Sequence, residues 1–276
     1  MIKVTQSKKI KKSIILDKKE GETPLQSLEK FRNKNPEYKN VSMTYAGRLD
    51  PMASGLLLIL AGEEVKKKEK YLALPKEYEF EILFGFATDT YDILGKVLSC
   101  VRQDLTQESE SKKLKKLIQQ NLKFFTGKFI QKYPPYSSKP VNGKPMFAHS
   151  RAGTKVIIPE REVSVSKLEL LKVKKINKIK LLENIEKRIN KVDGPARPHE
   201  GSGAGGDFRQ KEIIKIWQKE LTRNKKSIEK FLVVKFKIKC GSGTYVRGIA
   251  NSLGDKVGIP ALAFSIKRTK IGKWTK

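Results

Sequence analysis

The chain has 276 residues, with 59 Lys or Arg against 29 Asp or Glu and a formal net charge of +30. Such an excess of positive charge points to a polyanionic partner, above all a nucleic acid, although solubilisation by surface lysine would give the same composition. Hydrophobic residues make up 38%, enough for a substantial core. Because the N-terminus lacks an apolar leader and no apolar run could cross a bilayer, we expect a cytoplasmic monomer without membrane attachment.

Cysteine and histidine are too few for a zinc site. The two cysteines, Cys100 and Cys240, form no CxxC pair, and the only histidines are His149 and His199. A disulfide between the two cysteines stays open, but a disulfide-stapled secreted domain is excluded, and no metal is expected.

The first third of the chain predicts strands and one helix. Residues 13–17 are typical of a short strand, and Thr23 before Pro24 predicts the capped start of a helix over residues 24–32. The apolar run LLLIL at 56–60, bounded by glycines, predicts a strand covered on both faces.

The middle of the chain alternates between strand, helix and loop. The segment 76–85, KEYEFEILFG, alternates strictly and predicts a strand with Tyr78 on its core face. Residues 111–125 predict a helix, 131–145 a loop rich in Pro and Gly, and 231–240 another strand.

A basic block at about 172–228 interrupts this strand-rich pattern, and we interpret it as an insertion, partly flexible, in a single domain spanning 1–276. One predicted helix has its apolar side formed by Ile176, Ile179, Leu182, Ile185 and Ile189. A Gly-rich loop, DGPARPHEGSGAGG, leads to a second predicted helix, RQKEIIKIWQKEL. The block either contacts RNA phosphates or is a solvated excursion.

Two charged residues stand out as candidates for chemistry. Asp50, in YAGRLDPMAS, lies beside a proline and against a buried strand, where a carboxylate needs a compensating partner. Arg247 lies in the first turn of a helix that follows CGSGTYVR, with Thr244 as its predicted cap and Tyr245 on its apolar side. The plain alternatives are an Asp-Pro turn and an ordinary helix cap.

Other candidates have structural explanations of similar weight. Tyr78 is most simply a core residue. Asp89 and Asp92, in ATDTYDILG, are three residues apart and lack a third ligand, so side-chain bonds to their own turn are favoured over a metal site.

In this order, the motifs resemble the TruB-type pseudouridine synthases, which convert a T-loop uridine of transfer RNA to pseudouridine. The resemblance runs through six stretches that cover about half of the chain: LDKKEGETP, AGRLDPMASGLL, KEYEFEILFGFATDTYDILG, QKYPPYSSKPVNGKPMFAHSRAG, GTYVRGIANSLGDKVG and KRTKIG. It implies an α+β catalytic domain with a mixed, mainly antiparallel sheet, surrounding helices and a central cleft, acting on the T-loop and T-stem of transfer RNA without a cofactor.

The resemblance also implies roles for single residues. Asp50 is similar to the family aspartate that acts on the ribose–base linkage of uridine 55, by attack on the sugar or by removal of a ribose proton. Arg247 is similar to the arginine that pairs with it, and Tyr78 to the tyrosine that packs on the flipped base. Leu262 matches more loosely an apolar residue of the pocket.

The sequence departs from the family pattern at three places. Tyr45 replaces a histidine that contacts the T-loop, and Arg48 is more typical of synthases that act on ribosomal RNA, so both are expected at the substrate. Pro140 replaces a loop lysine, with Lys139 one residue earlier. The chain ends soon after KRTKIGKW, so we expect the C-terminal RNA-binding PUA domain of many relatives to be absent. A synthase for other structured RNA and a noncatalytic RNA-binding protein remain alternatives.

Overall fold

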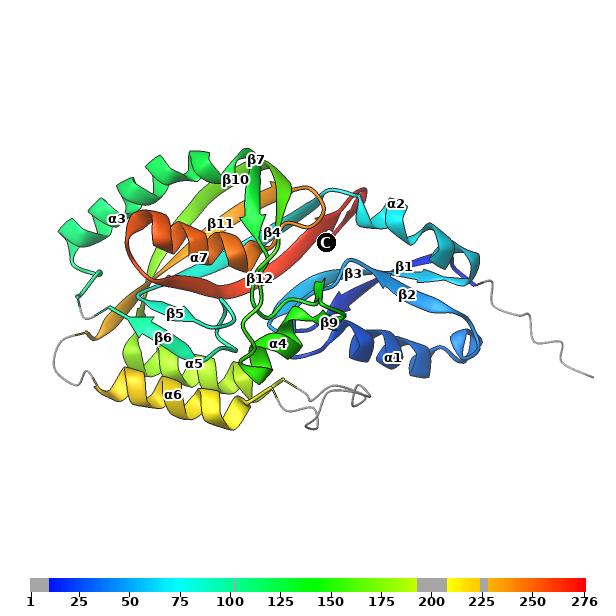
Figure 1. The fold of residues 1–276 in the computed structure, drawn as a ribbon, viewed down its shortest axis with the longest axis horizontal. Coiled ribbons are helices and arrows are strands. Elements are labelled where there is room, and N and C mark those ends of the chain that lie inside the picture. Colours follow the sequence, from blue (N-terminus) through cyan, green and yellow to red (C-terminus); the bar gives the residue numbers. More distant parts are fainter. Residues whose placement is uncertain (1–9, 102, 193–207, 224–227) are drawn as a thin grey trace, which may run out of the picture.

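The computed structural model describes all residues except 1–9, 102, 193–207 and 224–227. Its main sheet has nine strands, in the order β1-β3-β12-β4-β11-β10-β7, with β2 paired to β3 and β13 to β12 (Figure 1). The strands of this sheet are β1 (Ser13–Lys18), β2 (Met43–Ala46), β3 (Ala53–Ala61), β4 (Lys76–Phe84), β7 (Gly127–Lys132), β10 (Glu160–Asn177), β11 (Lys230–Cys240), β12 (Ala261–Ile271) and β13 (Trp274–Thr275). Every pairing is antiparallel except β3 with β12, which confirms the expected mixed, mainly antiparallel sheet.

Seven helices and two small hairpins surround this sheet within the described residues. The helices are α1 (Pro24–Lys34), α2 (Lys68–Leu72), α3 (Glu108–Asn121), α4 (Met146–Ala152), α5 (Lys178–Ile189), α6 (Gln210–Arg223) and α7 (Val246–Val257). The hairpins are β5 (Phe86–Thr88) with β6 (Val97–Cys100) and β8 (Pro140–Val141) with β9 (Lys144–Pro145). None of the described helices is both long and apolar enough to cross a membrane.

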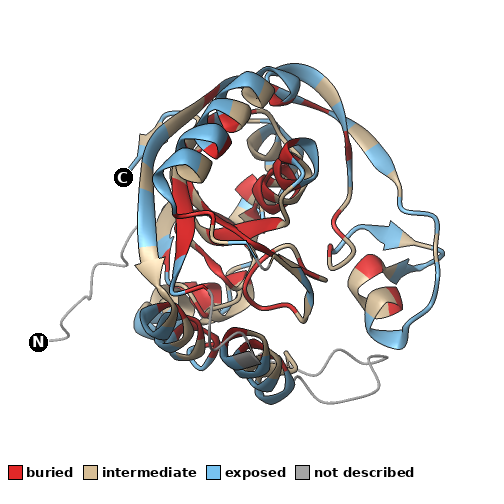
Figure 2. Cartoon of the chain, turned by 90° about the vertical axis from the view of Figure 1, so that its left-hand side faces the viewer, coloured by how far each residue is buried: buried red, intermediate tan, exposed pale blue. Residues whose placement is uncertain are grey.

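The period-two pattern of β4 sorts the helices onto two faces of the sheet. The Tyr78, Phe80 and Ile82 side chains pack with α3 and α7, whereas Leu83 packs with α5 and α6. Because successive side chains of a strand point to opposite faces, these two helix pairs cover opposite sides of the sheet. Figure 2 shows the buried strands enclosed between the helices.

The N-terminal predictions are confirmed. Helix α1 begins at Pro24, and Thr23 and Gln26 form a reciprocal capping box ahead of it. Strand β3 is buried on both faces because Leu57 packs towards α1, whereas Leu58 packs towards the segment around Tyr71.

The block at 172–228 differs from the prediction in two respects. Residues 172–177 continue strand β10 and pair with β11, so the first helix begins only at Lys178. The buried side of that helix is formed by Leu181, Ile185 and Ile189, whereas Ile179 is 62% exposed. The spacing of Ile176 and Ile179 imitates a helical repeat, but the long-range pairing of Ile176 with Phe231 decides the structure.

In the sequence, helices α5 and α6 connect β10 to β11, and the two strands pair where they meet this connection, with Asn177 opposite Lys230. The two helices pack on each other and on the sheet (Figure 1), and Trp217 of α6 is fully buried. The pair is therefore part of the core rather than a solvated excursion. The Gly-rich loop predicted between the two helices lies outside the described residues.

Candidate active site

Asp50 lies in the turn that joins β2 to β3. Gly47 and Gly55 flank this turn with φ angles of +92° and +102°, a region that side chains other than glycine rarely adopt. A Cβ atom on Gly55 would also lie 2.2 Å from the backbone oxygen of Arg268. Glycine is therefore required where the turn meets β12.

Asp50 and Arg247 form an ion pair that joins residues 197 positions apart in the chain. Arg247 Nε donates to Asp50 Oδ2 at 2.7 Å. The Arg247 side chain is 3% exposed, whereas that of Asp50 is 38% exposed. A buried guanidinium thus holds a carboxylate that remains open to solvent, and the predicted partnership is observed.

The N-terminus of α7 differs in one detail from the prediction. The capping residue is Tyr245, with no side-chain capping bond, and Thr244 instead donates from Oγ1 to the backbone oxygen of Gly241. Gln131 of β7 instead holds the backbone of the capping residue, because its Oε1 accepts from Tyr245 N at 2.9 Å and its Nε2 donates to Tyr245 O at 3.0 Å. A distant glutamine thus fixes the start of the helix.

Arg247 also donates to two backbone oxygens. Its Nη1 bonds to Thr90 at 2.6 Å and its Nη2 to Tyr136 at 3.0 Å. Burial would lower the pKa of Arg247, but the carboxylates of Asp50 and Asp92 outweigh burial and raise this pKa. The guanidinium therefore joins three segments: the turn that carries Asp50, the ATDTYDILG loop (residues 87–95) and the loop of residues 131–145, called the Pro-rich loop below.

Asp92 is a second carboxylate near this guanidinium and, unlike Asp50, it is buried. Its Oδ1 accepts from Thr90 Oγ1 at 2.7 Å and from Leu94 N at 2.9 Å. Burial raises the pKa of Asp92 to about 6, against the opposing charge of Arg247. Asp89 accepts in the same way from Lys96 N, so both acids bond within their own loop as predicted. Among the described residues no cluster of three potential metal ligands occurs.

Tyr78 lies on the buried face of β4, directly opposite Arg268 of β12. The Arg268 guanidinium is fully buried and donates to the backbone oxygens of Leu56 and Gly47. Burial raises the pKa of Tyr78, and the charge of Arg268 opposes this effect. Arg268 therefore connects Tyr78 to both ends of the turn that carries Asp50.

Lys18, the last residue of β1, also supports the turn that carries Asp50. Its Nζ is fully buried and donates to the backbone oxygens of Lys19, Pro51 and Ala53. Burial lowers the pKa of Lys18 to about 8. Sequence reasoning missed Lys18 and Arg268 because nothing in the sequence distinguishes these two buried cations from the many surface ones. The available signal was that Lys18 lies within the motif LDKKEGETP and Arg268 within KRTKIG.

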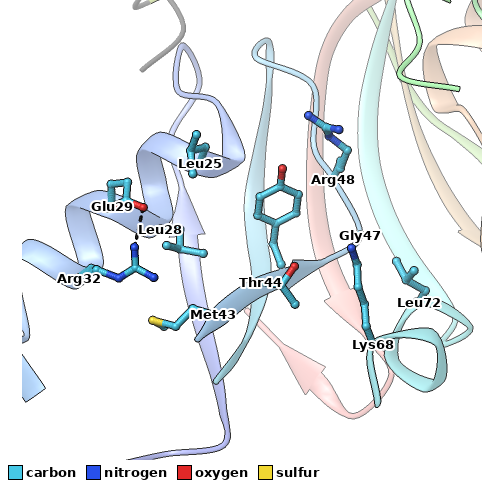
Figure 3. A pocket seen from close by; sticks show the side chains of 11 residues that line it. Leu25, Leu28, Glu29, Arg32, Met43, Thr44, Gly47, Arg48, Lys68 and Leu72 are labelled. Atoms are coloured by element: carbon cyan, nitrogen blue, oxygen red, sulfur yellow. Dashed lines mark hydrogen bonds and ion pairs between the residues drawn. The ribbon is translucent and has the colours of Figure 1, made fainter. Parts of the chain in front are cut away.

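Tyr45 and Arg48 lie beside the turn, in a separate pocket of about 410 Å³ between α1, β2 and α2 (Figure 3). The Arg48 guanidinium carbon is 5.7 Å from the centroid of the Tyr45 ring. The pocket also contains the cations Arg32 and Lys68. Asp50 does not line this pocket, so these two predicted substrate residues lie next to the ion pair rather than on it.

Leu262 lies on the other face of the sheet from Tyr78. It pairs with Leu83, is fully buried and packs in the cluster of α5 and α6. Ile266, which pairs with Phe80 two register positions from Tyr78, packs on the Tyr78 side together with Ala261 and Ala263 of β12. The pocket-lining role of Leu262 stays a prediction. Both cysteines are free, which settles the open question of a disulfide.

Comparison with known proteins places these motifs in one family. The family described as TruB family pseudouridylate synthase (N terminal domain) matches residues 36–188, more than half of the chain. The chain is 30% identical over 255 residues to a tRNA pseudouridine synthase B from Lactobacillus acidophilus, covering 92% of this chain and 66% of that protein. It is 33% identical over 159 residues to the Aquifex aeolicus protein of that name, covering 58% of this chain and 52% of that one.

Solved structures show the same fold at lower identity. An H/ACA RNP bound to a substrate RNA containing 2'-deoxyuridine includes a chain that matches with a TM-score of 0.50 and 17% identity, over 96% of this chain and 48% of that one. A chain of a Cbf5-Nop10-Gar1 complex matches with the same TM-score and identity, over 96% and 50%. The present chain thus spans about half to two thirds of the relatives it matches. From the family match and the sequence relatives, the chain belongs to the TruB family of pseudouridylate synthases.

Proposed function

We propose that the protein isomerises a uridine of transfer RNA, uridine 55 of the T-loop, to pseudouridine. The observation that carries the proposal is the Asp50–Arg247 pair, in which a solvent-accessible carboxylate is fixed by a buried guanidinium. The bond between ribose C1′ and uracil N1 breaks, the uracil turns, and a bond from C1′ to C5 replaces it. The C5 proton leaves and N1 gains a proton, so the product is an isomer of the substrate. Asp50 would act on the ribose side of this exchange.

The other site residues fit supporting roles in this reaction. A uridine in a folded loop must leave its stack, which costs on the order of a few kcal/mol that stacking and phosphate contacts offset. Tyr78 would pack against the uracil, whereas Tyr45 and Arg48 would contact the RNA around the target. The cations of their pocket suit a phosphate backbone. The net reaction changes no oxidation state and transfers no external group, so it requires no cofactor.

Release of tritium from RNA labelled at uridine C5 tests this proposal. Wild-type protein should release tritium from a transfer RNA transcript, whereas Asp50→Asn should abolish release but retain RNA binding. The same substitution at Asp255, an exposed carboxylate on α7, serves as the matched control and should leave release unchanged. A wild-type protein that binds RNA but releases no tritium from any transcript would point to a noncatalytic RNA-binding role.

A second RNA substrate class is favoured by one residue. Arg48 lies over Tyr45 where it can meet incoming RNA, and an arginine in that motif position is more typical of synthases acting on ribosomal RNA. A transcript lacking uridine 55 separates the two cases. Loss of tritium release supports the T-loop, whereas undiminished release, or a preference for ribosomal fragments, supports the second class.

A further inference from the structure

The residues just before α6 reach back to the active-site loops. Phe208 and Arg209 immediately precede Gln210, the first residue of α6. The guanidinium of Arg151, on α4, is 5.8 Å from the centroid of the Phe208 ring. Two consecutive residues of the 172–228 block therefore lie against the Pro-rich loop and α4, far from them in sequence.

Arg209 forms an ion pair with the ATDTYDILG loop. Its Nη1 lies 2.9 Å from Asp89 Oδ2, and the two side chains are 22% and 18% exposed. The other oxygen of Asp89 accepts from Lys96 N, so the carboxylate connects Arg209 directly to the backbone of that loop. The backbone of Arg209 has a φ angle of +60°, a left-handed conformation that arginine rarely adopts. Such a conformation persists where its surroundings fix it.

Arg209 also stacks on the Pro-rich loop. Its guanidinium carbon is 4.7 Å from the centroid of the Tyr136 ring, within the range of a cation–π contact. The backbone oxygen of the same Tyr136 accepts from Arg247 Nη2. Burial, followed by the nearby Asp89 carboxylate, raises the pKa of the Tyr136 hydroxyl. One arginine thus contacts both loops whose backbone oxygens orient Arg247.

We propose that Arg209 is a positioning residue, which holds Tyr136 and the Asp89 loop in the arrangement that aims Arg247 at Asp50. The proposal rests on the function proposed above for the Asp50–Arg247 pair. Arg209 touches neither of those residues and acts through the two loops. Because its charge is balanced by Asp89 and its side chain is mostly covered, a direct contact with RNA phosphate is the less favoured role.

Three variants of the full-length protein test this role. Arg209→Ala removes both the ion pair and the stack, and Arg209→Lys keeps the charge but not the planar group. Lys215→Ala removes an exposed cation of α6, the helix that follows Arg209, and serves as a control. We expect the single-turnover rate at saturating transfer RNA to fall about tenfold in Arg209→Ala and about threefold in Arg209→Lys. The dissociation constant for RNA should stay within twofold of wild type, and Lys215→Ala should match wild type throughout.

Hydrogen exchange of the free protein provides a readout that does not depend on activity. Amides of residues 133–145 should exchange at least about fivefold faster in Arg209→Ala than in wild type or Lys215→Ala. Unchanged exchange, or a rate loss matched by an equal loss of RNA affinity, would overturn the positioning role. If exchange rises in Arg209→Ala but wild type makes no pseudouridine, the proposed function is wrong, whereas the role of Arg209 in holding the Pro-rich loop is supported.

Discussion

The turn that carries Asp50 and the helix pair α5–α6 are stabilised by different means. Around the turn, buried cations such as Arg247, Arg268 and Lys18 donate to backbone oxygens and carboxylates. The helix pair instead buries mainly apolar side chains around Trp217, although Arg188 of α5 is a buried cation that pairs with Glu20 and donates to the backbone oxygen of Phe264. A buried cation is costly unless it is fully hydrogen-bonded, so its presence marks a place where geometry matters more than stability. Apolar packing alone needs no such precision.

The largest effect is expected where the ion pair is broken. Arg247→Met should lower pseudouridine formation at least about a hundredfold, because the carboxylate loses the group that orients it. It should also cost about 3 kcal/mol of unfolding free energy, since Asp92 stays buried without its nearest cation. Lys256→Met, an exposed cation on the same helix, is the control for single-turnover assays and urea titration. Near-normal activity in Arg247→Met would refute the assignment.

A similar loss of stability, without a direct effect on chemistry, is expected in the helix pair. Trp217 is fully buried, lies 5.1 Å from the Phe86 ring and donates to the backbone oxygen of Ile93 at 3.1 Å. Trp217→Ala should therefore destabilise the protein by about 3–5 kcal/mol. Calorimetry should show one transition at lower temperature. Two separate transitions would mean that the pair unfolds independently of the sheet.

Asp92 should produce a pH dependence of intermediate size. Its folded pKa of about 6 exceeds the reference value of 3.8, so between these pH values the unfolded chain has lost a proton that the folded protein retains. The contribution of Asp92 to the unfolding free energy should therefore fall by up to about 3 kcal/mol as pH rises from 4 to 7. Asp92→Asn lacks this contribution. In thermal denaturation, the stability of wild type relative to Asp92→Asn should increase as pH falls from 7 to 4. A difference in stability that does not change with pH would contradict the prediction.

The smallest effect is expected on the exposed strand surface. Glu79 and Lys235 form an ion pair at 2.6 Å with both side chains more than a third exposed. Glu79→Gln should change the unfolding free energy by less than about 1 kcal/mol. A larger loss in urea titration would show that surface pairs contribute to this fold as buried ones do.

The sequence predicts elements well where their periodicity is local, and fails where distant pairing decides. The alternation of β4 and the position of Thr23 before Pro24 were sufficient for correct predictions. The first helix predicted within the 172–228 block was wrong at its start, where Ile176 was assigned to it, because pairing with β11 extends β10 to Asn177. Which face of the sheet Leu262 occupies depends on the register between β12 and β4. This register is irregular, with a shift between Ala263 and Ser265, and the periodicity of the sequence does not reveal it.

The candidate site could be predicted only in part. Asp50 and Arg247 lie in recognisable motifs, and physical reasoning required a cation near the carboxylate. Their 2.7 Å pairing is observed only in the folded chain. Lys18 and Arg268 could not be singled out, because among 59 basic residues burial is what distinguishes them. Arg209 could not be singled out either, because its contacts with Asp89 and Tyr136 exist only in the folded chain.

The parallel pairing of β3 with β12 has a consequence for how the protein folds. Ala53 pairs with Ile266, and Arg268 supplies the donor for Leu56 across 212 positions of sequence. A contact of such long range carries a large loop-closure cost and forms slowly. During synthesis, the Asp50 turn must wait for almost the whole described chain to emerge before β12 can close upon it. The N-terminal strands can pair early, but the arrangement of Asp50 with Arg247 and Arg268 is expected to be among the last parts to form.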